Sequence, residues 1–267
     1  MSDQFPTRPP TEPVGSPPVW GALPPPPPPP PPAPVIRWGL GDVLIALVIW
    51  LLGGVVAAFV VVAMGEADTP LDQLGLGALF VSIASGWPGF VGWPLVATYR
   101  KGQRSLRLDF GLDLVPVDIA WGLLGGFGAL MLSVFGNVLW TAISGESAPT
   151  NTDFLPKHPS ALTVVVLVLL IAVCTPIVEE LFFRGLFLRA LGRRWNLTVG
   201  VIVSSIVFGL FHFQGDSLAQ GLFICGVTAS YGALFALLVV RANGRLGPSI
   251  VAHMVVNLVG VLATIYL

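Results

Sequence analysis

The sequence predicts an all-α fold: a polytopic bundle of about seven transmembrane helices behind a disordered, proline-rich N-terminal tail. Three observations lead to this prediction. Hydrophobic residues make up 54% of the 267 residues and charged residues only 10%, whereas a soluble domain carries roughly 25% charged residues. From Trp38 onward, apolar residues form successive runs of about 20, the length that crosses a bilayer. The first 34 residues have a different composition, with an unbroken proline run from Pro24 to Pro32.

The tail is predicted to cover residues 1–36. Proline has no N–H and a fixed φ, so this segment should be polyproline II or disordered. It lacks the basic stretch and apolar core of a signal peptide. Two interpretations of the tail stay open: a docking segment for a proline-recognition module of the SH3 or WW kind, or a spacer without a partner.

The apolar runs of the rest of the chain are predicted to form N-terminal transmembrane helices (37–150) and a C-terminal core (151–267). The fifth run is short. The predicted spans, in chain order, are 38–63, 76–99, 117–143, 161–185, 197–213, 218–240 and 247–267.

Charged residues alternate between the two ends of these spans. Basic residues precede the first span and follow the second, fourth and sixth: Arg37, Arg100, Lys101, Arg104, Arg107, Arg189, Arg193, Arg194, Arg241 and Arg245. The intervening loops carry acidic residues, with Lys157 as their only basic one: Glu66, Asp68, Asp72, Glu146, Asp153 and Asp216. Cytoplasmic loops carry the excess of Lys and Arg. We therefore expect a cytoplasmic N-terminus and an external C-terminus.

Composition also narrows the partners. The net charge is −1, and no basic cluster is dense enough for a nucleic-acid surface. Cys174 and Cys225 lie inside apolar runs, which favours small buried hydrophobes over a disulfide framework. The chain has no CxxC pair that would indicate a structural zinc site. The lipid bilayer is the expected partner.

Glu179, Glu180 and Arg184 form the first polar group inside a predicted span. Ionisable groups are costly in a bilayer and are functional candidates by default. Glu180 and Arg184 stand at i,i+4 and can form an ion pair, while Glu179 points roughly 100° away. A carboxylate in a poorly solvated site suits a general base. The alternative is that all three lie at the cytoplasmic interface.

Two further pairs lie in later spans, each at i,i+4 on one helix face. Phe208 and His212 form the first pair, and a lone histidine there is more often a buried core residue than a catalyst. His253 and Asn257 form the second pair. Their imidazole and amide can both donate hydrogen bonds, as an oxyanion requires; a polar contact between helices is the alternative.

Other protease motifs are weak or absent. The chain has no HExxH zincin motif. Residues 39–42 read Gly-Leu-Gly-Asp, the GxGD string of presenilin-type aspartyl proteases. However, Asp42 stands at the start of the first span and has no second intramembrane aspartate to act with.

The ordered set EExxxR, FxxxH and HxxxN on successive hydrophobic helices resembles the CPBP family of intramembrane proteases. This family includes the CAAX-processing Rce1-type proteases and bacterial homologues linked to bacteriocin processing and immunity (ABI domain). The resemblance covers roughly Ala161 to Leu267, and no motif position is substituted. It implies that Glu179, His212, His253 and Asn257 are catalytic. Glu180, Arg184 and Phe208 would be supporting residues.

The resemblance implies hydrolysis of a peptide bond in a membrane-associated protein or peptide. Glu179 would take a proton from water, and His253 with Asn257 would stabilise the oxyanion. His212 would orient the water or protonate the leaving amine. The family has been described both as glutamate proteases and as metalloproteases. With two histidines and an asparagine the residues favour a metal-free site, and zinc held by Glu and two His stays an alternative.

Two other functions stay open: a non-catalytic membrane scaffold or immunity protein, and a proton-coupled transporter. The absence of an internal repeat argues against transport. The preference for Arg over Lys and the many Ala, Val, Gly and Pro residues suggest a GC-rich bacterial genome. We therefore expect a bacterial plasma membrane protein.

Overall fold

The computed structural model describes residues 35–267, and this part of the chain is all-helical, without strands. The predicted tail falls almost entirely on residues 1–34, which lie outside the described residues, so its disorder and its docking role stay predictions. In chain order the helices are α1 (Leu40–Ala63), η1 (Leu71–Gln73), α2 (Leu76–Ala84), η2 (Pro88–Gly92), α3 (Trp93–Lys101), α4 (Leu106–Phe110), α5 (Pro116–Ser144), α6 (Ala161–Leu167), η3 (Val168–Cys174), α7 (Thr175–Glu180), η4 (Leu181–Phe187), α8 (Leu188–Arg194), α9 (Leu197–Leu210), α10 (Leu218–Arg241) and α11 (Gly247–Tyr266).

Within residues 35–267, six helical segments are long and apolar enough to cross a membrane. They are Leu40–Ala63, Leu76–Lys101, Pro116–Ser144, Ala161–Arg194, Leu218–Arg241 and Gly247–Tyr266. The prediction of about seven spans needs one correction. The fifth predicted span is α9, which has 14 residues and ends at Leu210. That is roughly 21 Å at 1.5 Å per residue, too short for a span of about 30 Å.

The second span contains a change of helix type at a proline. Pro88 opens η2, a π-helical turn between α2 and α3. Proline cannot donate the backbone hydrogen bond of an α-helix interior, and its ring clashes with the carbonyl four residues earlier. The wider turn absorbs this interruption, and the helix continues to Lys101.

The fourth span runs continuously from Ala161 to Arg194 and contains two π-helical segments, η3 and η4. They flank α7, the six-residue α-helical stretch that ends with Glu179 and Glu180. The Thr175 hydroxyl at the start of α7 donates to the Leu170 carbonyl of η3 at 2.9 Å, five residues earlier. Wider turns inside an α-helix occur frequently at functional sites.

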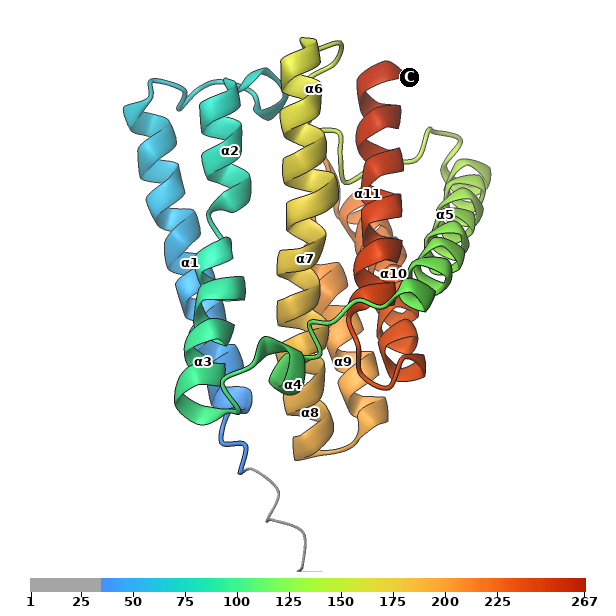
Figure 1. The fold of residues 1–267 in the computed structure, drawn as a ribbon. Coiled ribbons are helices and arrows are strands. Elements are labelled where there is room, and N and C mark those ends of the chain that lie inside the picture. The colour runs from blue at the N-terminus through green and yellow to red at the C-terminus, as the bar shows by residue number, and fades with distance from the viewer. Residues whose placement is uncertain (1–34) are drawn as a thin grey trace, which may run out of the picture. The chain divides into compact units, whose positions relative to one another are not determined.

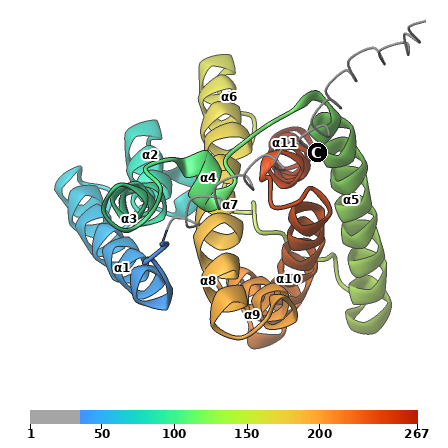
Figure 2. The ribbon, with the colours of Figure 1, turned by 60° about the horizontal axis from the view of Figure 1, so that its bottom comes forward.

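This fourth span lies at the centre of the bundle (Figures 1 and 2). The helices α1, α2 and α3 lie on one side of it, and α5, α10 and α11 on the other. The helix α11 packs against α5, α10 and η3, while α9 packs against α8 and α10. The central helix therefore meets both α9 and α11, the helices that carry the two histidine motifs.

Glycines allow the closest helix contacts. A Cβ added at Gly126 of α5 would lie 2.7 Å from the Val255 Cβ of α11. One added at Gly209 of α9 would lie 2.8 Å from the Ala229 Cβ of α10. Small residues let helix backbones approach in this way in membrane proteins.

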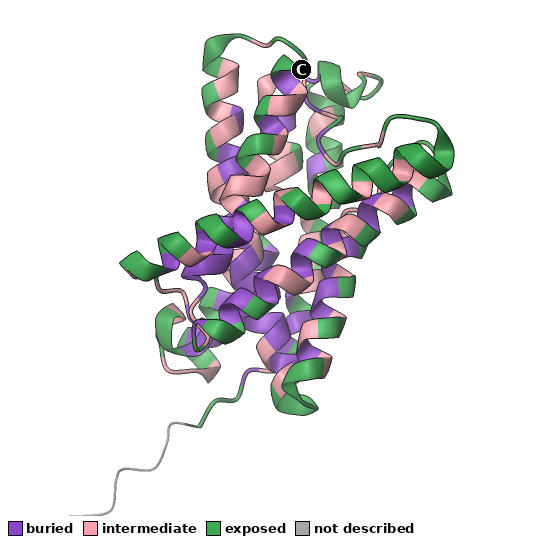
Figure 3. Ribbon diagram, turned by 90° about the vertical axis from the view of Figure 1, so that its right-hand side faces the viewer, coloured by how far each residue is buried: buried purple, intermediate pink, exposed green. Residues whose placement is uncertain are grey.

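The outward faces of the helices are apolar. Phe59 of α1 is 71% exposed and Phe135 of α5 is 68% exposed, and exposed residues follow the outer faces of the bundle in Figure 3. A soluble protein would bury most such residues. Together with the span lengths, these faces identify an integral membrane protein.

At the end of the bundle where α1 begins, acidic side chains are buried in structural contacts. Asp42 accepts hydrogen bonds from the Gly39 N–H, the Trp93 indole and Lys101. Asp118 of α5 accepts two hydrogen bonds from the Arg245 guanidinium, at 3.0 and 2.7 Å. The aspartate of the GxGD string is thus occupied in joining α1 to α3.

Candidate active site

Glu180 and Arg184 form a buried ion pair on one face of the central helix, at the i,i+4 spacing seen in the sequence. The Arg184 Nη1 donates to Glu180 Oε1 at 2.8 Å, and the two side chains are 1% and 0% exposed. The Nδ1 of His253 lies 3.1 Å from the same carboxylate oxygen. A carboxylate that bonds to Arg184 accepts hydrogen bonds, so Nδ1 of His253 carries the hydrogen. The pair therefore fixes both the position and the tautomer of His253.

Aromatic rings surround the guanidinium of Arg184. Its Cζ lies 4.4 Å from the ring centroid of Phe208, 5.5 Å from that of Phe235 and 5.8 Å from that of Phe183. A desolvated cation gains from contact with aromatic faces. The Nη2 donates to the Gly232 carbonyl of α10 at 3.0 Å. Arg184 thus connects the central helix with α9 and α10.

Glu179 lies on a different side of the helix and has a different environment. Its Oε2 is 3.7 Å from Nε2 of His253. Among the described residues this oxygen has no hydrogen-bond partner, although it is itself buried. The Glu179 side chain is 19% exposed, whereas that of Glu180 is fully buried. Of the two carboxylates, Glu179 is the one without an arginine partner and the one whose side chain is partly exposed.

His253 therefore lies between the two carboxylates. Its Nδ1 faces Glu180 and its Nε2 faces Glu179. The ring of Phe235 stacks on the imidazole, with centroids 5.1 Å apart. Hydrogen bonding on one edge and stacking on one face hold the imidazole in a single orientation.

His212 reaches the same region despite the shortness of α9. Its ring centroid is 4.7 Å from that of Phe208, and the Phe208 ring is 5.7 Å from that of His253. The two histidines therefore flank one phenylalanine. The Nδ1 of His212 is 2.8 Å from the Phe208 carbonyl, which can only accept. Nδ1 is therefore the donor, and a neutral His212 presents Nε2 as an acceptor.

Asn257 lies one helical turn beyond His253 on α11. Its Nδ2 donates to the Ile171 carbonyl at 2.9 Å. Ile171 belongs to η3, where the π-helical turns leave backbone carbonyls open to other donors. One N–H of the amide is thus used to join α11 to the central helix, and the second remains for a ligand.

Two contributors could not be found from sequence motifs. Phe235 stacks on His253 and belongs to α10, in which no motif was recognised. Gly232 contributes only its backbone carbonyl. A carbonyl group is present in every residue, so sequence contains no signal for it. The four-residue i,i+4 spacing of Tyr231 and Phe235 is typical of ordinary helix packing as well.

The donor set for a metal ion is incomplete in this geometry. Zinc sites in proteins use at least three imidazole, thiolate or carboxylate ligands. Within residues 35–267, no group of three His, Cys, Asp or Glu side chains is arranged to hold a metal ion. Glu179 and His253 are adjacent, but a third ligand does not join them.

Known proteins resemble the part of the chain that carries the three motifs. Residues 161–259 match the model of the family described as type II CAAX prenyl endopeptidase Rce1-like. A Bacillus subtilis (strain 168) protein named "Putative membrane peptidase YdiL" is 26% identical over 161 residues, covering 60% of this chain and 59% of that protein. An Escherichia coli protein named "Uncharacterized 24.3 kDa protein" is 27% identical over 154 residues, covering 56% of this chain and 66% of that protein.

The chain thus spans about three fifths to two thirds of the length of these curated relatives. No solved structure matches it. All seven residues of the three motifs lie inside the matched segment. The resemblance that these motifs indicate is therefore confirmed for this part of the chain, since residues 161–259 match the Rce1-like family model.

Proposed function

We propose that this protein is an intramembrane endopeptidase in which Glu179 activates a water molecule. The observation that carries the proposal is the position of His253 between two unlike carboxylates. Glu180 is neutralised by Arg184 and orients the imidazole, while Glu179 has no arginine partner and its side chain is 19% exposed. A scaffold would need no such difference between adjacent glutamates.

The proposed reaction starts with water bound by Glu179 Oε2 and His253 Nε2. These atoms, 3.7 Å apart, can each accept one hydrogen bond from the same water. Glu179 takes a proton as the water oxygen attacks the peptide carbonyl, and a tetrahedral oxyanion forms. Glu179 then passes this proton to the leaving nitrogen as the C–N bond breaks. One water is consumed, and the products are an acid and an amine.

The remaining polar groups are assigned from their free donors and acceptors. Asn257 has an unused N–H for the oxyanion, whose stabilisation is often the largest contribution to catalysis. His212 presents an acceptor nitrogen, which suits orientation of water better than protonation of the amine. The geometry also favours a water-orienting role for His253 over the role of oxyanion donor that the motif suggests. The proposed reaction uses no metal ion, because Glu179 and His253 alone do not make a metal site.

The substrate class is a peptide or a membrane-associated protein. The Rce1-like domain and the membrane-peptidase relative support a peptide bond as the target. The relatives are bacterial, and the basic residues gather at one end of the bundle. We assign the protein to a bacterial plasma membrane with its N-terminus in the cytoplasm.

The test is cleavage of a quenched fluorescent peptide library by detergent-purified protein. The wild type is compared with Glu179→Ala and with Glu146→Ala, which changes an exposed loop glutamate as a matched control. Each is assayed with and without a chelator. We expect cleavage by wild type and control, none by Glu179→Ala, and no effect of chelation. Loss on chelation would require a metal-based mechanism, and equal activity of all three proteins would contradict the role of Glu179.

A further inference from the structure

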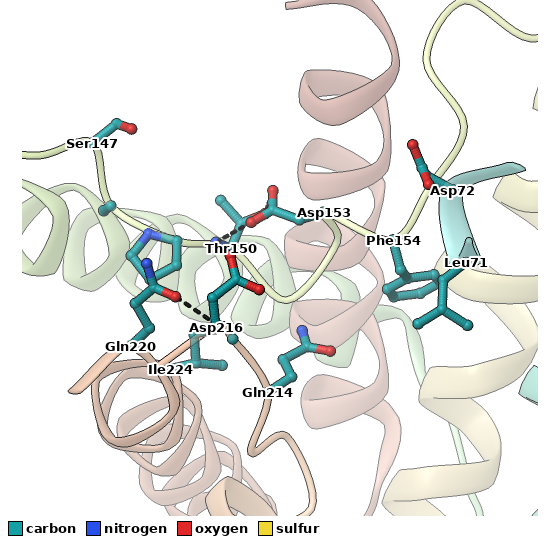
Figure 4. A pocket seen from close by; sticks show the side chains of 13 residues that line it. Leu71, Asp72, Ser147, Thr150, Asp153, Phe154, Gln214, Asp216, Gln220 and Ile224 are labelled. Carbon is teal, nitrogen blue, oxygen red and sulfur yellow. Dashed lines mark hydrogen bonds between the residues drawn. The ribbon is translucent and has the colours of Figure 1, made fainter. Parts of the chain in front are cut away.

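Three cavities adjoin one another at the end of the bundle opposite the start of α1, where the loops carry Asp72, Asp153 and Asp216. We call this the acidic end. The outer cavity has a volume of about 540 Å³ and is lined by these three aspartates, Gln214 and Gln220, among others (Figure 4). The middle cavity is a neck of about 60 Å³, and the inner one measures about 340 Å³.

The cavities share their walls. Thr150 lines all three. Ile224 lines the outer and the middle cavity. Ser133, Asn137 and Tyr231 line both the middle and the inner cavity. The three volumes therefore follow one another from the loops into the bundle, between α5 and the pair α10 and α11.

The wall that α5 contributes is polar although it belongs to a transmembrane helix. Ser133 and Asn137 stand at i,i+4 on one face. Asn137 lies about 10 Å below the end of α5 at 1.5 Å per residue. Its side chain is exposed in the described part of the chain. An unsatisfied amide is costly in hydrocarbon but not in water, so polar residues in spans usually face water-filled cavities.

The opposite face of the same helix is apolar. Phe135 is 68% exposed, lines none of the three cavities and points about 160° away from both polar residues at 100° per residue. At the same depth in the bundle, the polar face of α5 therefore faces the cavities and its apolar face is directed toward lipid.

The inner cavity reaches one residue of the candidate active site, Asn257. Asn257 and Val256 of α11 line it, and Asn257 lies one turn from His253. Hydrolysis requires water and a peptide carbonyl at Glu179, which the lipid-facing surfaces of the bundle do not supply. The chain of cavities leads to this region from the acidic end.

We propose that the three cavities form one aqueous passage from the acidic end to Asn257, by which water and an extended peptide segment reach the site. Ser133 and Asn137 of α5 and Tyr231 of α10 line it and offer hydrogen bonds to the main chain of that peptide. The part of the proposal that concerns the peptide rests on the proposed function, and the part that concerns water access does not.

Cysteine labelling tests the passage without an activity assay. Single cysteines are introduced as Asn137→Cys and, for the matched control, Phe135→Cys, in full-length protein with Cys174→Ala and Cys225→Ala. A charged, membrane-impermeant methanethiosulfonate reagent is added to oriented membranes from either side, and labelling is followed by mass spectrometry. Because the thiolate reacts in water, we expect Asn137→Cys to react at least about tenfold faster than Phe135→Cys. The faster reaction should occur from the side where the C-terminus lies.

Residue-resolved mass spectrometry also keeps the test valid in the wild-type background if removal of the native cysteines impairs folding. Equal labelling at the two positions, or faster labelling from the side of the N-terminal end of α1, would overturn the passage. In the cleavage assay, a bulky reagent attached at position 137 should lower peptide hydrolysis at least about tenfold, and one at position 135 should not. Fast labelling together with an active Glu179→Ala variant would keep the passage and reject the proposed function. Slow labelling of Asn137→Cys, in an enzyme whose cleavage depends on Glu179, would keep the proposed function and reject the passage.

Discussion

At the scale of single residues, the site depends on an asymmetry between two neighbouring carboxylates. Glu180 is paired with Arg184 and fully buried, and Glu179 has no arginine partner and is partly exposed. The intervening imidazole of His253 contacts both through different nitrogens. This division predicts that the structural and the catalytic contributions of His253 can be separated by mutation.

His253→Asn and His253→Gln should differ in their effect on thermal stability. An asparagine amide can occupy the place of Nδ1 and keep the contact with Glu180, so thermal stability should change little while cleavage is lost. A glutamine amide reaches the place of Nε2 and loses the contact with Glu180, which leaves a buried acceptor short of a partner and costs about 1–3 kcal/mol. Thermal unfolding and peptide cleavage of the two purified variants check this. Equal stability of both variants would show that the contact with Glu180 does not matter.

Arg184→Met should be strongly destabilising, because it leaves the Glu180 charge buried without its partner. Breaking a buried ion pair from one side costs about 3–5 kcal/mol. The double variant Glu180→Gln with Arg184→Met removes both charges and should recover part of that loss. The measurement is the midpoint of thermal unfolding in detergent. A double variant less stable than Arg184→Met alone would contradict the interpretation of the pair.

At the scale of helices, much of the site could be predicted from the sequence. Spacings of four residues placed Glu180 with Arg184 and Phe208 with His212 on common faces, and the structure shows both contacts. Helical periodicity is local, so sequence reveals it. The π-helical segments around Glu179 and Glu180 could not be predicted in this way. They change which backbone groups are exposed, and Asn257 uses one of these carbonyls.

The position of α9 in the bundle is the other feature of the site that could not be predicted from the sequence. Its 14 residues are too few to cross a bilayer, yet His212, two residues beyond its end, contacts Phe208, whose ring also contacts that of His253. The close contact between α9 and α10 places His212 there. Gly209, which follows Phe208 in α9, lets the short helix lie directly on α10. Such tertiary positioning depends on residues of another helix and leaves no local pattern.

Gly209→Val should therefore disturb the site from a distance. Its side chain would meet the backbone carbonyl of Cys225 and the Ala229 Cβ, and overpacking of this kind costs about 1–3 kcal/mol. We expect lower thermal stability and lower cleavage, since Phe208 and His212 move with α9. Gly226→Ala is the matched control on α10, where a Cβ would meet nothing within 4 Å. That change should be neutral or stabilise by up to about 1 kcal/mol. Unchanged activity of Gly209→Val would show that the position of α9 is not required.

At the scale of the whole bundle, the two ends differ in charge. Basic residues gather where α1 begins, and aspartates line the cavity at the other end. From the positive-inside bias we expect the acidic end to face away from the cytoplasm. The passage to the active site would then open to the outside.

Reporter fusions after Leu267 test this orientation. Alkaline phosphatase, which is active only outside the cytoplasm, should be active when fused there, and a green fluorescent protein should be dark when exported unfolded at the same site. A bright fluorescent fusion with an inactive phosphatase would reverse the orientation and place the entrance of the passage in the cytoplasm.

The most direct test of the central claim is the effect of Glu179→Gln on kcat/KM with a peptide that the wild type cleaves. The amide keeps the size of the carboxylate but cannot take a proton from water. We predict a fall of about 10²–10⁴-fold, the usual contribution of a general base, with an unfolding midpoint equal to that of the wild type. Cleavage by Glu179→Gln at the wild-type rate would contradict the claim and would leave the Rce1-like domain without the base assigned to it here.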